Sequence, residues 1–188
     1  MPNTYIFLRH AKVRKDTEEP SETWVLSEEG IKFIEEVAAT GIFDNVERII
    51  TSAQKKCIQT AYFLAERLDK EIITNPGLNE IDKGTNLIED PEEYEELVKN
   101  VFDNYSESVA GWEPAIQAFR RFQITMDRIE QEYRHNIILI VSHGIVLTLY
   151  FNHLLKENQG SLFPRWKALK SCAWGRVKEN EVLRDIIL

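Results

Sequence analysis

The sequence of 188 residues contains little cysteine, glycine or proline. With eight glycines and six prolines it lacks the composition of a collagen or of a low-complexity disordered chain. Its two cysteines, Cys57 and Cys172, lie far apart and do not have the spacing of a metal site. A disulfide scaffold is therefore excluded, and we expect two reduced thiols in a reducing compartment.

Basic charge and long apolar runs are also scarce. With 31 acidic and 23 basic residues the net charge is -8, which argues against nucleic acid or an anionic membrane as the main partner. The apolar run before Arg9, residues 5–8, is too short for the core of a signal peptide, and no other run approaches the length of a membrane span. We therefore expect a cytoplasmic protein, and the chain length fits a single domain over residues 1–188.

Short apolar runs alternate along the chain with stretches of helical period. Runs of the kind found in buried strands lie at 5–8, 49–50, 72–73, 137–141, 173–177 and 182–188. Apolar residues at helical spacing predict helices over 31–38, 53–68, 115–133 and 145–155, with Ser27 as the first cap and Asp90-Pro91 as a further helix start. This alternation is typical of a three-layer α/β/α sandwich around a mostly parallel central sheet.

Polar residues of the kinds used in catalysis and ligand binding follow three of these strands. The first strand ends in Arg9-His10, the second in Thr51-Ser52, and the third in Ser142-His143-Gly144. Because ligands bind beyond the carboxyl ends of parallel strands, we expect His10 and His143 to lie together in a functional site. The other two histidines, His135 and His153, do not follow a strand in this way, so we interpret them as structural.

Five segments, in order along the chain, resemble the signature motifs of the histidine phosphatase superfamily, in its phosphoglycerate-mutase-like branch. They are Leu8-Arg9-His10-Ala11, Leu26-Ser27-Glu28-Glu29-Gly30, the segment 52–61 (SAQKKCIQTA), Gly77-Leu78-Asn79-Glu80 and Val141-Ser142-His143-Gly144. Together they span nearly the whole chain, and the resemblance implies the phosphoglycerate-mutase-like fold.

The resemblance also implies a mechanism that needs no metal and no cofactor. His10 would be the nucleophile that forms a phosphohistidine, which water then hydrolyses. Arg9 would bind the phosphoryl oxygens through its planar guanidinium, and His143, in its protonated form, would stabilise the negative charge on the transferring group. Glu80 matches the family's proton donor to the leaving oxygen, with Asp82, two residues on, as the alternative acid.

One position departs from the family pattern. Lys56 stands where the family usually has a second arginine, and it keeps the positive charge but loses the bidentate geometry. The phosphate-binding set implied by the resemblance is therefore Arg9, Lys56 and His143. Three cations that follow the nucleophile motif either compensate for the lysine or form an exposed basic loop: Lys12, Arg14 and Lys15.

Three functions remain open at this stage. The first is a phosphatase acting on a small phosphorylated molecule, which a basic pocket mouth would admit. The second is phosphoglycerate-mutase-type transfer, which is disfavoured because the 62 residues between Glu80 and His143 contain no arginine-rich substrate loop. The third, motivated by Lys56, is a catalytically weak module that binds phosphate or phosphoprotein. The sequence assigns no role to Trp24, Trp112 and Trp166.

Overall fold

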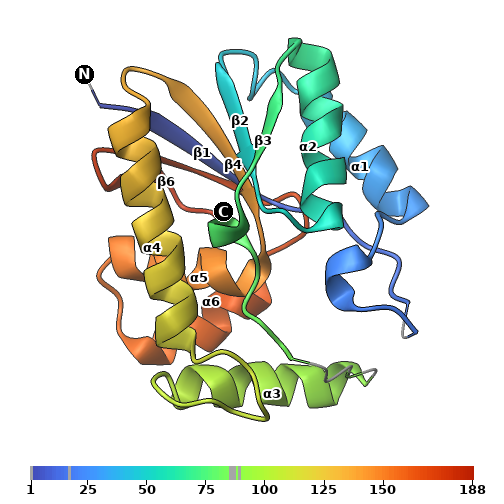
Figure 1. Cartoon of the computed structure of the whole chain (residues 1–188), viewed down its shortest axis with the longest axis vertical. Helices are drawn as coiled ribbons and strands as arrows, with labels where there is room; N and C mark the ends of the chain where they lie inside the picture. Colours follow the sequence, from blue (N-terminus) through green and yellow to red (C-terminus); the bar gives the residue numbers. More distant parts are fainter. Residues whose placement is uncertain (1, 17, 85–87, 89) are drawn as a thin grey trace.

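The computed structural model describes residues 2–16, 18–84, 88 and 90–188 (Figure 1). At its centre is a six-stranded sheet with the strand order β3-β2-β4-β1-β5-β6. The strands are β1 (Thr4–Arg9), β2 (Arg48–Thr51), β3 (Ile72–Thr74), β4 (Ile137–Ser142), β5 (Trp174–Lys178) and β6 (Glu181–Arg184). The first four run parallel, while β5 is antiparallel to β1 and β6 to β5. The sheet is therefore mostly parallel, as predicted.

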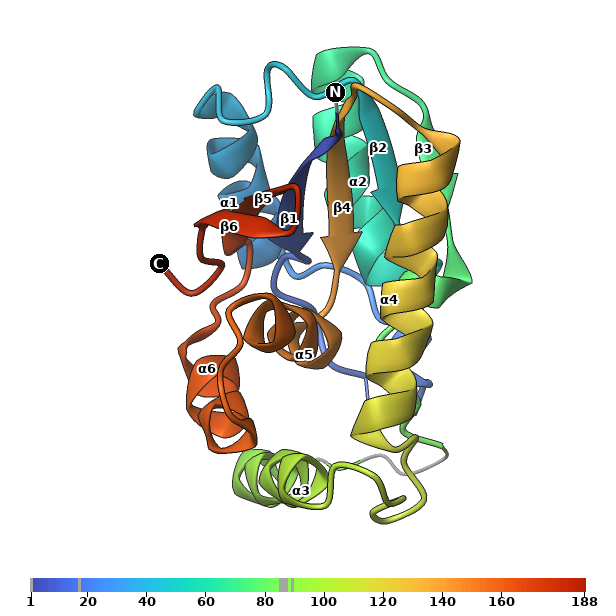
Figure 2. The same cartoon turned by 90° about the vertical axis from the view of Figure 1, so that its left-hand side faces the viewer.

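Helices cover both faces of this sheet, which confirms the predicted three layers (Figures 1 and 2). One face carries α1 (Glu28–Ala39) and α2 (Lys55–Leu68), and the other carries α4 (Ala115–Glu132) and α5 (Gly144–Leu154). Beyond α5 lie α3 (Pro91–Asp103), which begins at the predicted Asp90-Pro91 start, and the short α6 (Leu162–Ala168). The sequence pattern did not predict α6. No helix in the described part of the chain is both long and apolar enough to cross a membrane.

The continuous apolar strands are explained by burial on both faces. In β1, Tyr5 and Phe7 belong to the hydrophobic cluster beneath α4 and α5, whereas Ile6 and Leu8 belong to the cluster beneath α1 and α2. Successive side chains of a strand point to opposite faces, so a strand covered on both sides needs apolar residues at every position. The same alternation holds in β4, where all but the first residue are buried.

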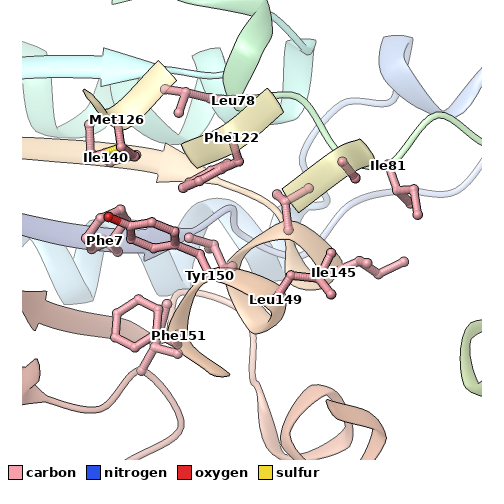
Figure 3. Close-up of a cluster of buried hydrophobic side chains, with 14 of the residues drawn as sticks. Phe7, Leu78, Ile81, Phe122, Met126, Ile140, Ile145, Leu149, Tyr150 and Phe151 are labelled. Atoms are coloured by element: carbon pink, nitrogen blue, oxygen red, sulfur yellow. The ribbon is translucent and has the colours of Figure 1, made fainter. Parts of the chain in front are cut away.

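The larger cluster extends to the edge of the sheet where the strands end (Figure 3). Leu78 and Ile81 are almost completely buried in it, together with Phe122 of α4 and Ile145 of α5. Leu78 and Ile81 lie on either side of Glu80 in the sequence. The segment that carries the candidate acid is therefore fixed by hydrophobic contacts rather than left as a free loop.

Both predicted helix caps are present. Ser27 Oγ accepts the Gly30 N–H at 3.0 Å, and Asp90 accepts two backbone N–H groups in the first turn of α3. The start of α1 also holds the loop that follows His10, because Lys12 O accepts the Ser27 N–H at 2.9 Å. A Cβ on Gly30 would lie only 2.1 Å from this carbonyl oxygen, so the close approach requires glycine.

The last predicted strand, 182–188, is shorter in the structure. The tight turn at 179–180 is confirmed, with φ of 52° and 62°, as a two-residue hairpin turn requires. Strand β6, however, ends at Arg184. Beyond it the chain turns, and Asp185 accepts a hydrogen bond at 2.6 Å from the buried Arg165 of α6. This ion pair, which the apolar pattern does not show, lies directly after the end of the strand.

Candidate active site

The two predicted histidines lie together at the carboxyl edge of the parallel strands. His10 directly follows β1 and His143 directly follows β4, and these neighbouring strands pair Arg9 with Ser142. The two imidazole ring centroids are 5.2 Å apart, with an interplanar angle of 64°. The site predicted at the strand ends is thus assembled by the register of the sheet.

The tautomer of His10 follows from its neighbour. Its Nδ1 lies 2.8 Å from the carbonyl oxygen of Ala11. A carbonyl oxygen can only accept, so Nδ1 carries the proton. In the neutral ring, Nε2 then keeps its lone pair, which is the atom that a histidine nucleophile uses.

Both histidines are held in the neutral form. Burial lowers the pKa of His10 well below its usual range, and the charges of Arg9 and Lys56 lower it further. Burial also lowers the pKa of His143, with His10 and Lys56 as the next causes. His10 is therefore available as a nucleophile at neutral pH. For His143 this environment favours the neutral imidazole over the protonated form that the resemblance implied.

Arg9 brings a permanent positive charge to the same edge. Its Nη1 donates to Leu169 O, while its buried Nε has no hydrogen-bond partner among the residues described. The guanidinium packs on the first residue of α5, where a Cβ on Gly144 would touch its Cζ at 3.4 Å. A buried N–H without a partner has a free energy cost, which an anion at this edge would remove.

Lys56 lies in the first turn of α2. Its side chain is only 5% exposed, and Nζ donates to Ser21 O at 2.7 Å, 5.8 Å from the centre of the Trp24 ring. Burial, followed by the charge of Lys83, lowers the pKa of Lys56 to about 8. The charge of Lys56 in turn contributes to lowering the pKa values of both histidines.

The three cations that follow the nucleophile motif, Lys12, Arg14 and Lys15, do not line the cleft that Glu80 lines. Lys12 is exposed and forms an ion pair with Glu29 of α1. Arg14 lines a separate, smaller pocket, and Lys15 is exposed. Of the two interpretations that the sequence left open, the structure supports the exposed basic loop.

The two candidate acids have different surroundings. The carboxylate of Glu80 accepts the N–H groups of Ile145 and Val146 at 3.0 and 3.1 Å, in the first turn of α5. This places Glu80 beside His143, which directly precedes that helix. Asp82 is exposed, and its Oδ1 accepts the N–H of Gly84 at 2.8 Å within its own loop. The geometry therefore brings Glu80, and not Asp82, to the histidine pair.

A family model for the histidine phosphatase superfamily (branch 1) matches residues 5–181. The chain belongs to the histidine phosphatase superfamily. The match spans all five motifs and the whole of the site described above. A search of the curated proteins finds no match.

Solved structures share the fold over almost the full length of this superfamily member. YhfR from Bacillus stearothermophilus superposes with a TM-score of 0.78 at 17% identity, over 99% of this chain and 100% of that one. A mycobacterial glucosyl-3-phosphoglycerate phosphatase with VO3 gives 0.75 at 17% identity, over 97% and 96%. A phosphoglycerate mutase from Bacillus anthracis gives 0.75 at 16% identity, over 98% and 92%. At these identities the likeness shows the fold and no more.

The superfamily member has a further cation in its site, Lys83, which the sequence analysis missed. Its Nζ donates to the Tyr94 hydroxyl at 2.7 Å and lies over the Tyr94 and Trp112 rings, 4.7 and 5.3 Å from their centres. Its charge contributes to lowering the pKa of both His10 and His143. The one sequence signal was its position three residues after Glu80, in the same loop.

Arg121 of α4 is a second residue that the sequence analysis missed. Its guanidinium donates to three carbonyl oxygens of the acid segment, Gly77 O and Asn79 O at 3.0 Å and Glu80 O at 3.2 Å. The same side chain pairs with Glu113 at 2.9 Å. Arg121 thus fixes the backbone that carries the candidate acid, and no motif points to it.

Glu80 and Lys83 are among the residues that line an open cleft of about 1600 Å³. Three aromatic side chains line it as well: Trp24, Tyr94 and Trp112. Its remaining charged side chains are four acids and two bases, Glu18, Glu22, Asp82, Glu113, Lys55 and Arg121. The sequence-based prediction of a basic pocket mouth is therefore wrong, because acidic side chains outnumber basic ones in the lining. Trp166, also unassigned by the sequence, is absent from the lining and stacks on Phe163.

Proposed function

We propose that the protein is a phosphatase that hydrolyses a small phosphomonoester through a phosphohistidine on His10. The observation that carries this proposal is a neutral His10, with its Nε2 lone pair free, close to the positive charges of Arg9 and Lys56. Cations beside a neutral nucleophile suit a phosphate dianion, because they attract it and leave the nucleophile unprotonated. Family membership and fold support the same chemistry.

In the first step, Nε2 of His10 attacks phosphorus and the bond between phosphorus and the leaving oxygen breaks. Glu80 gives its proton to that oxygen. Arg9 and Lys56 bind the other phosphoryl oxygens. His143 donates to them once the dianion favours its second proton, since opposite charges at close range favour the charged form.

In the second step, water attacks the phosphohistidine, Glu80 takes a proton from the water, and inorganic phosphate leaves with Nε2 free again. The side chains supply all the positive charge in this scheme, so we propose that neither a metal nor a cofactor takes part. With a net charge of -8, we expect a small phosphorylated molecule rather than nucleic acid as the substrate.

Hydrolysis of p-nitrophenyl phosphate from pH 5 to 8 with EDTA tests the proposal, comparing the wild type with His10→Ala. His153→Ala is the matched control, because His153 is exposed and packs on Phe119, away from the site. We expect turnover in the wild type and the control and none in His10→Ala. Rapid quenching with labelled substrate should trap acid-labile phosphate only where His10 is present.

Two other outcomes would replace the proposal. Absence of turnover in every variant, with phosphate still bound, would favour the phosphate- or phosphoprotein-binding module. Transfer of the labelled phosphoryl group to a second hydroxyl of a phosphoglycerate, rather than to water, would favour mutase-type chemistry.

A further inference from the structure

Lys83, three residues after the candidate acid Glu80, has surroundings that are unusual for a lysine in a surface loop. Lys83 lies in the cleft with its ammonium over the faces of two aromatic rings, those of Tyr94 and Trp112. A cation over aromatic faces is attracted by their negative π clouds while it loses contact with water. The rings and the hydroxyl of Tyr94 therefore hold the charge of Lys83 in one place.

Lys83 lines the same cleft as the candidate acid Glu80. Its charge also contributes to lowering the pKa values of His10, His143 and Lys56. Burial by itself lowers the pKa of Lys83, but Tyr94 and Glu80 outweigh it, and the pKa lies above its usual value. Lys83 thus remains charged where Lys56 begins to lose its proton.

Lys83 also has hydrogen-bonding capacity to spare. An ammonium group has three N–H donors. Among the described residues, the Tyr94 hydroxyl is the one hydrogen-bond acceptor of Nζ. Within the described part of the chain, no other acceptor takes the remaining donors of Lys83, which can therefore bind an anionic oxygen. Lys12, Arg14 and Lys15 do not offer this, since they lie outside the cleft.

We propose that Lys83 is a phosphoryl-binding residue of this enzyme, held by Tyr94 and Trp112, and that it compensates for the lysine at position 56. The proposal rests on the phosphatase function proposed above. A lysine at position 56 cannot form the bidentate hydrogen bonds to two phosphoryl oxygens that an arginine would form. A second ammonium, approaching from the acid segment, supplies the missing contact from another direction.

The test compares Lys83→Met and Lys83→Arg with Lys12→Met, which removes the same charge from the exposed loop. A charge-assisted hydrogen bond is worth about 1.5–3 kcal/mol, so Lys83→Met should lower kcat/KM for p-nitrophenyl phosphate by roughly 10- to 100-fold. Inhibition by inorganic phosphate should weaken in the same variant. Lys83→Arg should recover most of both effects, and Lys12→Met should resemble the wild type.

The pH profile provides a readout that a merely structural role would not move. Removing the charge of Lys83 takes away one cause that lowers the pKa of His10. In Lys83→Met the acidic limb of kcat/KM should therefore shift to higher pH. An active Lys83→Met protein with unchanged phosphate inhibition and an unmoved acidic limb would overturn the proposal. So would a loss of activity that Lys83→Arg does not recover and that a lower Tm accompanies.

Failure of the underlying function would look different. If the wild type does not hydrolyse phosphomonoesters, calorimetric titration with inorganic phosphate still tests Lys83. Weaker phosphate binding in Lys83→Met than in Lys12→Met would support the assignment, and equal binding in the two variants would refute it.

Discussion

The Oγ of Ser52 lies 2.7 Å from Nε2 of His143, and the bonds around this serine establish which atom donates. The Asn79 Oδ1 accepts both the Ala53 N–H at 2.9 Å and the Ser52 hydroxyl at 2.8 Å. With its own proton used there, Ser52 Oγ can only accept from His143, as it does from the Gln54 N–H at 3.2 Å. Nε2 of His143 therefore carries a proton, and Ser52 orients the ring.

Ser52→Ala should lower kcat for p-nitrophenyl phosphate by roughly 10- to 100-fold, because the His143 N–H loses its acceptor and the ring its orientation. Circular dichroism should show an unchanged fold. Cys57→Ala is the matched control, since its thiol also contacts His143, at 3.3 Å from Nε2, but is a weak hydrogen-bonding group. Equal activity losses in the two variants would contradict an orienting role for Ser52.

Lys56→Arg should remove the fall in kcat/KM that the wild type shows at alkaline pH. A lysine is charged below its pKa, which for Lys56 is about 8, so its attraction for phosphate declines as the pH rises through that value. Because kcat/KM reports the free enzyme, wild-type kcat/KM should fall above about pH 8. An arginine does not lose its proton there, and the variant should keep its activity.

The measurement is kcat/KM from pH 6 to 10 for both proteins. The buried thiol of Cys57 cannot cause the limb, because burial raises its pKa far above this window. A limb near pH 8 that persists in Lys56→Arg would assign it to another group.

The leaving-group end of the cleft should discriminate against a second negative charge. Its rim, the charged lining other than Glu80 and Lys83, has four acids and two bases. Arg121 pairs with Glu113, so three acids and one base remain. Glycerol 3-phosphate and 3-phosphoglycerate are a matched pair, since they differ in a hydroxymethyl group and a carboxylate. We expect kcat/KM to be roughly tenfold higher for glycerol 3-phosphate, from repulsion of the carboxylate near the protein surface.

This difference should shrink at high salt, because the charges that cause it are exposed to solvent. It should also shrink in Glu22→Gln, whose side chain is exposed at the rim. A preference for 3-phosphoglycerate would show that the rim does not select by charge.

Gly30→Ala should destabilise the protein. The new Cβ would lie 2.1 Å from the carbonyl oxygen of Lys12, and this backbone atom cannot move without displacing the loop after His10. Overpacking of this kind costs about 2 kcal/mol, which lowers Tm by roughly 4–8 °C for a chain of this size. Glu35→Ala, an exposed position on the same helix, should change the free energy of unfolding by less than about 0.5 kcal/mol. The measurement is the Tm of the wild type, Gly30→Ala and Glu35→Ala by thermal unfolding.

The sequence alone predicted the layers of the fold and the meeting of the two histidines. Strands buried on both faces must be apolar throughout, so 5–8 and 137–141 were recognisable without tertiary information. Parallel strands end at one edge, so residues that directly follow them, His10 and His143, come together whatever their distance along the chain. The helix caps at Ser27 and Asp90 are local and were equally visible.

The tertiary structure decided which charged side chains belong to the site. Lys12 lies two residues after His10 yet pairs with Glu29, whereas Lys83, 73 residues along the chain from His10, lines the cleft together with Glu80. The direction of a loop side chain has no period in sequence, because it depends on the partners that other elements present. For Lys83 those partners are aromatic rings from distant segments, and no local pattern encodes them. The sequence therefore determined where the chemistry is centred, and the packing of the loops determined which charges surround it.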